Sequence, residues 1–145
     1  MRDTLSGWAA EFLHEVRVAV ISTLNKDGSP HVTAVWYALA DDGTLIVTTQ
    51  AISHKLKNLR RDPRIALCIG DMGRSVSLYG HVSIIEDEAV IRQDIERIAE
   101  RYVQDASIRS RVIANLLQRS PLALHFRPEK ITEFSTEHTG SSIMS

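Results

Sequence analysis

The sequence lacks the features that mark secreted, membrane-spanning or strongly charged proteins. It has one cysteine, Cys68, in 145 residues, which excludes an internal disulfide and any multi-cysteine metal site and fits a reducing cytoplasm. No apolar run approaches the roughly 20 residues that a bilayer-spanning helix needs. The formal net charge is -1, which gives no electrostatic reason to expect nucleic acid or an anionic membrane as a partner. We therefore expect a soluble cytoplasmic protein with a single domain over residues 1–145.

Motifs for metal binding and for side-chain catalysis are also missing. The six histidines show no metal-ligand spacing. The glycine-flanked serine of hydrolases, the dinucleotide-binding glycine motif and the Walker loop do not occur. Cys68 lies in mid-strand between Leu67 and Ile69, which predicts a packing role. We therefore predict no metal site and no side-chain nucleophile or general base; Tyr37 or Tyr79 could donate a proton, but neither has a visible activating partner.

The sequence does contain many short β-rich segments with turn signals between them. Strands are predicted over residues 17–24, 31–39, 44–49, 64–69, 75–85, 122–127 and 130–135, the first three as an antiparallel meander. Gly80 predicts a bulge or bend in the long strand 75–85. Amphipathic helices are predicted within 5–13, 53–61, 87–102 and 108–117. This pattern indicates an α+β fold, mainly β, built on a closed barrel, with a loose tail over 136–145.

The densest unusual feature is the basic run from Ser53 to Arg64. It holds two lysines, three arginines and one histidine against a single aspartate. Ser53 suits the N-cap of a helix that ends before Asp62 and Pro63. A helix N-terminus that follows a strand offers free N–H groups, and lysine adds positive charge there, so the run could hold a phosphate. The alternative is a solvated basic helix face, which is what most charge runs are.

Segment 31–39 carries a second candidate feature. Its alternation places Val32, Ala34 and Trp36 on one face of the predicted strand. Small residues beside an indole leave room for a flat ring system, although a tryptophan taken alone is more often core or dimer interface than a cofactor wall. Thr48 and Thr49 end the next strand just before the basic helix, so their hydroxyls could meet a phosphate or polar ring edges. Threonine is, however, common in strands generally.

The order and spacing of these segments resemble the pyridoxamine-5′-phosphate-oxidase-like superfamily. The segments that carry the resemblance are Val20–Leu24, Asp27–Val32, Val35–Tyr37, Leu45–Thr49, Ser53–Arg64 and Tyr79–Val82. The resemblance implies a six-stranded antiparallel split β-barrel with peripheral helices, and two cofactor sites at the interface of a homodimer. By matching positions, it implies that Lys55, Lys57 and Asn58 hold a cofactor phosphate with Ser53 nearby. It also implies that Ala34, Val35, Trp36, Val47, Thr48 and Thr49 line the cofactor ring.

Members of this superfamily bind FMN or the deazaflavin coenzyme F420, and a few bind haem or tetrapyrrole products. The FMN oxidases place an arginine on the second strand, and segment 31–39 has none. The stretch Asn58–Arg64 is similar to the deazaflavin-dependent reductases, so F420 is favoured over FMN. The resemblance then implies hydride transfer between the cofactor and a small electron-poor substrate. Two alternatives remain open: a non-catalytic flavin, deazaflavin or tetrapyrrole carrier, and an interaction barrel without cofactor.

Overall fold

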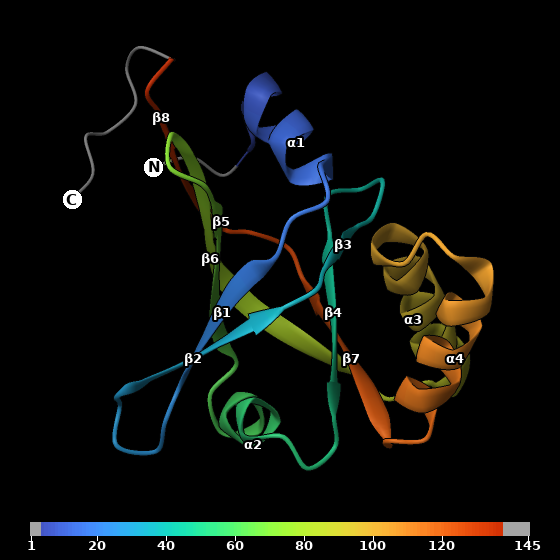
Figure 1. Cartoon of the computed structure of the whole chain (residues 1–145). Helices are drawn as coiled ribbons and strands as arrows, with labels where there is room; N and C mark the ends of the chain where they lie inside the picture. Colours follow the sequence, from blue (N-terminus) through green and yellow to red (C-terminus); the bar gives the residue numbers. More distant parts are fainter. Residues whose placement is uncertain (1–3, 138–145) are drawn as a thin grey trace.

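The computed structural model describes residues 4–137 and shows one curled antiparallel sheet with four helices in that part of the chain (Figure 1). The strands are β1 (Ala19–Leu24), β2 (Pro30–Val35), β3 (Ala38–Leu39), β4 (Leu45–Gln50), β5 (Arg64–Gly70), β6 (Arg74–Ile85), β7 (Pro121–Phe126) and β8 (Lys130–Ser135). The helices are α1 (Gly7–His14), α2 (His54–Arg61), α3 (Glu88–Tyr102) and α4 (Ala106–Leu117). This confirms the predicted α+β, mainly β class; residues 4–137 contain eight strands, where the sequence pattern predicted seven and the resemblance implied six.

The sheet curls into a split barrel in which the two end strands are not paired with each other. Its strand order is β2-β1-β5-β6-β7-β4-β3, with β8 paired to β6. Strands β2 and β3 lie at the two ends of this order but are joined by only Trp36 and Tyr37. The sheet must therefore curl, because a two-residue connection keeps its two end strands close together. Strand β6 spans the two halves, because Arg74–Tyr79 pairs with β8 and Val82–Ile85 pairs with β7.

The predicted single strand 31–39 is wrong, and so is the meander built on it. The backbone leaves the sheet at Trp36 and Tyr37, and only the short β3 pairs with β4. Tyr37 causes the interruption because its side chain is fully buried. Its hydroxyl donates to the carbonyl oxygen of Leu13 at 2.8 Å, and its backbone N–H donates to the hydroxyl of Tyr102 at 3.2 Å. The backbone N–H of Tyr37 is therefore satisfied without a neighbouring strand.

Gly80 is required by a close approach and does not mark a bulge in the pairing with β5. The register runs without interruption through Ile65 and Gly80. A Cβ atom at Gly80 would lie 2.7 Å from Cε2 of Phe126 and 3.0 Å from the carbonyl oxygen of Arg127. Glycine is thus the residue that lets β6 pass beside the end of β7.

Helices α1 and α2 lie at opposite ends of the barrel, and α3 and α4 lie together outside it beside β4 and β7 (Figure 1). Helix α1 inserts Ala9, Phe12 and Leu13 into the main core. Helix α2 begins after Ser53, whose hydroxyl accepts from the backbone N–H of Leu56 at 3.2 Å, which confirms the predicted N-cap. Among residues 4–137 no helix is long and apolar enough to cross a membrane. The predicted loose tail lies, from residue 138 on, outside the described residues.

The predicted packing role of Cys68 is wrong, although its place in mid-strand is confirmed. Strand β5 buries Ile65, Leu67 and Ile69 inside the barrel, and the alternation of the strand turns Cys68 outward, where it is exposed. Only one face of this strand meets the core, so a mid-strand position between two apolar residues does not by itself bury a side chain.

Candidate functional site

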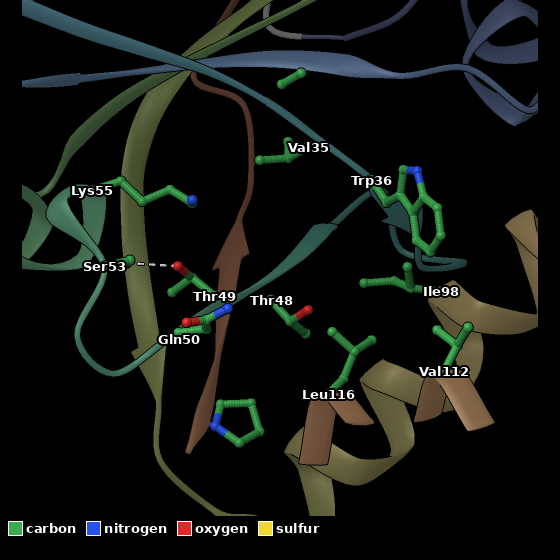
Figure 2. Close-up of a pocket in the computed structure, with 12 residues that line it drawn as sticks. Val35, Trp36, Thr48, Thr49, Gln50, Ser53, Lys55, Ile98, Val112 and Leu116 are labelled. Atoms are coloured by element: carbon green, nitrogen blue, oxygen red, sulfur yellow. Dashed lines mark hydrogen bonds between the residues drawn. The ribbon is translucent and has the colours of Figure 1, made fainter. Parts of the chain in front are cut away.

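A cavity of about 480 Å³ lies between the end of β2, strand β4 and the α3–α4 pair. Twelve residues line it: Ala34, Val35, Trp36, Thr48, Thr49, Gln50, Ser53, Lys55, Ile98, Val112, Leu116 and Pro121. Figure 2 shows polar side chains from β4 and α2 on one side and apolar side chains from α3 and α4 on the other. The cavity therefore has a polar, cationic end and an apolar end.

The polar end is built where β4 passes into α2. The hydroxyls of Thr49 and Ser53 lie 2.7 Å apart and share a hydrogen bond (Figure 2). Since Ser53 also accepts from the backbone N–H of Leu56, its position is fixed by the start of the helix. Thr48 and Gln50 also line the cavity. Hydroxyl and amide groups here can donate to or accept from the edge of a polar ligand.

Lys55 brings the cavity its only cationic side chain. It is half-buried, and its ammonium extends from α2 toward the cavity (Figure 2). Burial lowers the pKa of Lys55 below its usual value. The ammonium makes no hydrogen bond or ion pair with any residue within 4–137. A partly desolvated cation without a partner favours an anionic ligand, because the ligand would restore the lost solvation.

The aromatic end of the cavity is held by a stacked pair. Trp36 stacks on Tyr102, the last residue of α3, with ring centroids 4.8 Å apart and planes 3° from parallel. The Tyr102 hydroxyl donates to the backbone carbonyl of Arg17 and accepts from the backbone N–H of Tyr37. These bonds fix the tyrosine ring, which in turn supports the indole. Trp36 remains 39% exposed, so it offers a supported aromatic surface to a flat ligand.

Seven of the ten residues expected to bind the cofactor line this cavity: Ala34, Val35, Trp36, Thr48, Thr49, Ser53 and Lys55. Val47 instead lies in the barrel core and is 3% exposed. Lys57 is exposed and lies with Asn58 at a separate shallow depression beside the turn of the β1–β2 hairpin.

Helix geometry explains why the two lysines separate. Residues two apart on an α-helix point in nearly opposite directions, so Lys55 and Lys57 cannot share one face of α2. Asn58 is buried, and its amide donates to Oγ1 of Thr23 and to Oδ1 of Asn25, both at 3.0 Å. Asn58 thus ties α2 to β1 and its hairpin, and its hydrogen bonds are already used.

Sequence reasoning missed five of the lining residues: Gln50, Ile98, Val112, Leu116 and Pro121. Strand alternation contained a signal for Gln50, because it lies two residues after Thr48 and shares its face. Ile98, Val112 and Leu116 looked like core positions of amphipathic helices. Nothing in the periodicity of a helix tells whether its apolar stripe meets a core or a cavity.

The lining limits the chemistry that the protein itself can supply. Lys55 is the only titratable side chain among the twelve lining residues. No group of three or more potential metal-ligating side chains occurs within the described range 4–137. The cavity suits a ligand with an anionic group and a flat apolar body, and it fits a phosphorylated flavin-type group in charge and shape. The reactive chemistry would then belong to the bound group.

Comparisons with known proteins identify the family of the chain. The family model for pyridoxamine 5′-phosphate oxidase matches residues 7–133. The chain belongs to this family. An F420H(2)-dependent biliverdin reductase from Mycobacterium tuberculosis is 37% identical over 100 residues, which cover 68% of this chain and 72% of the relative.

Solved structures of other proteins show the same fold. A conserved hypothetical protein from Mycobacterium tuberculosis superposes with a TM-score of 0.80 at 27% identity, covering 98% of this chain and 92% of the other. A structure named as an F420 reductase gives a TM-score of 0.71 at 21% identity, covering 89% and 98%. The expected superfamily and its split-barrel fold are therefore confirmed.

Proposed function

We propose that this family member is an oxidoreductase that transfers a hydride between a flavin-type cofactor and a small electron-poor acceptor. The observation that carries the proposal is the half-buried Lys55, which has no ion-pair or hydrogen-bond partner among residues 4–137, in a cavity that also presents a supported indole. Coenzyme F420 is favoured over FMN because the relative at 37% identity is named for F420. When bound, the cofactor supplies the hydride; the protein binds it, orients it and excludes water.

The cofactor phosphate would lie against Lys55 and Ser53. The ring would lie along Ala34, Val35 and Trp36 on one side and Thr48 and Thr49 on the other, all of which line the cavity. In this arrangement Val47 and Asn58 do not contact the cofactor. Val47 holds β4 in the core, and Asn58 holds α2 against β1. Lys57 faces the β1–β2 hairpin and would contact only a ligand that extends past α2.

For the acceptor, the first compound to test is biliverdin. The relative at 37% identity is named for that substrate, and a conjugated molecule suits the apolar end of the cavity, which the cofactor phosphate leaves free. The test is turnover by the purified protein with reduced F420, or with reduced FMN, and biliverdin, followed by absorbance. Binding of a cofactor without any turnover, for this and other acceptors, would favour the alternative function of a non-catalytic flavin, deazaflavin or tetrapyrrole carrier.

A second copy of the chain would complete the site. The outer face of the sheet exposes Val20 and Val32, at 43% and 58%, and Cys68 lies opposite Val20 in the register. Ala34 also lies opposite Val20, and it lines the cavity. The apolar outer face and the cavity therefore meet at Ala34. We propose a homodimer through this face, and sedimentation should show a dimer at micromolar concentration in which the Cys68 thiol reacts slowly.

A further inference from the structure

The α3–α4 pair supplies a wall of the cavity that the proposed cofactor contacts leave unused. Ile98 from α3 and Val112 and Leu116 from α4 line it. Val112 and Leu116 are four residues apart, so they lie one above the other on the same face of the helix. Figure 2 shows both side chains directed toward the cavity, on the side away from Ser53 and Lys55. The polar and charged side chains of α4 do not line the cavity. This wall can therefore select by size and apolarity but not by charge.

Helix α4 packs on the edge of the molecule and not in the main core, so its residues can vary with the size of the acceptor. None of its residues is buried. It packs through Ile113, Leu116 and Leu117 onto a small apolar cluster of α3 and β7, apart from the main barrel core. An element with little buried apolar surface can change or shift without disturbing the core. Substitutions on α4 should therefore alter the cavity without unfolding the barrel.

The C-terminal end of α4 is nevertheless linked to the strand side of the cavity, and its N-terminal end is capped. At the N-terminus, the carboxylate of Asp105 accepts from the backbone N–H of Ile108 at 2.9 Å. After the C-terminus, the carbonyl of Ser120 accepts from the backbone N–H of Ala51 at 2.9 Å, directly after the cavity-lining Gln50. The Asp105 bond stabilises the start of the helix, and the Ala51–Ser120 bond links the chain after Leu117 to the end of β4.

We propose that Val112 and Leu116 are specificity-determining residues that contact the apolar part of the acceptor and set the largest acceptor that the cavity admits. The inference rests on the proposed function and deepens it. In this proposal residues of β2, β4 and α2 contact the cofactor, whereas residues of α4 contact the acceptor. An apolar pocket discriminates between ligands by size, and one methylene group is worth about ten- to two-hundredfold in specificity.

The test compares Val112→Phe with Ile108→Phe, a matched control on the same helix whose residue is 47% exposed and outside the cavity lining. Direct binding is measured by quenching of tryptophan fluorescence, with biliverdin as a large acceptor, menadione as a compact one, and F420 and FMN as cofactors. We expect Val112→Phe to weaken biliverdin binding at least tenfold. Menadione should change by less than threefold and either cofactor by less than twofold. Ile108→Phe should leave all four affinities within twofold.

Three results would overturn the assignment. The first is equal weakening of cofactor and biliverdin by Val112→Phe, which would place the cofactor against α4. The second is no effect on either, and the third is absence of acceptor binding to the wild-type protein. Failure of the proposed function would give a different result from these three. In that case neither F420 nor FMN would bind, but Val112→Phe would still weaken biliverdin binding. An unchanged melting temperature shows that each variant is folded.

Discussion

Replacement of Lys55 by alanine tests the phosphate contact, and Lys57→Ala is its matched control on the same helix. Both changes remove one positive charge, but only Lys55 lines the cavity, while Lys57 is exposed beside the β1–β2 hairpin. A charge-assisted hydrogen bond is worth about 1.5–3 kcal/mol. We therefore expect Lys55→Ala to weaken FMN and F420 binding about ten- to a hundredfold. Lys57→Ala should change either affinity by less than about threefold at physiological salt, because its charge is screened.

The ligand can be varied in the same experiment, since riboflavin differs from FMN only in lacking the phosphate. Wild type should prefer FMN to riboflavin by about tenfold or more, and Lys55→Ala should lose most of that preference. Isothermal titration of the two ligands against the three proteins measures the coupling. If Lys55→Ala weakens riboflavin and FMN equally, Lys55 does not contact the phosphate, and the reasoning from its unpaired ammonium fails.

The pH dependence of binding provides an independent check on Lys55. Burial lowers the pKa of the free Lys55 side chain, and an anionic ligand favours the charged form and raises that pKa again. Affinity for FMN should be full while Lys55 is protonated and should fall as the pH rises through the lowered pKa. NMR of the lysine side chain should show the pKa increase on addition of ligand, and an unchanged pKa would contradict the contact. Folding stability should change by less than about 0.5 kcal/mol in Lys55→Ala.

Three further predictions concern stability and the outer face. Hydrogen bonds from Arg64 hold the pKa of Asp62 at about 2, so their stabilisation is present above about pH 4 and lost as the pH falls toward 2; Asp62→Asn should flatten this part of a urea-unfolding series. The buried Asp94 carboxylate lies 2.6 Å from Nε2 of His125, and His125→Leu should lower the free energy of unfolding by about 2 kcal/mol in urea because it strands that carboxylate. Cys68→Ser should leave cofactor binding within a few-fold and chelators should have no effect; loss of binding in either case would show that the thiol or a metal takes part.

Much of the fold could be predicted because local signals agree with the final structure. The N-cap Ser53, the end of α2 before Pro63 and the hairpin turn at Gly28 each follow from one or two residues. The error at segment 31–39 came from a residue whose environment is entirely tertiary. Tyr37 is buried against Leu13 and Tyr102, which are distant in sequence, so alternation alone could not show that the strand ends there.

The candidate site was predictable on the strand side and not on the helix side. Seven expected residues meet at one cavity because the curl of the sheet brings the end of β2 near β4 and the start of α2. The two lysines of the basic run were expected to bind the same phosphate. Helix geometry places Lys55 and Lys57 on different faces of α2, so only Lys55 lines the cavity. The wall from Val112 and Leu116 could not be predicted, because it depends on where the α3–α4 pair packs.

The central claim is that one flavin-type cofactor binds each chain in the cavity that Lys55 enters. Its most direct test is an equilibrium titration of the wild-type protein with F420, monitored by quenching of Trp36 in a Trp8→Phe background. The account predicts saturable binding of one F420 per chain, competition by FMN, and loss of most of the quenching signal in Lys55→Ala at the same ligand concentration. Absence of saturable binding of both F420 and FMN would contradict it.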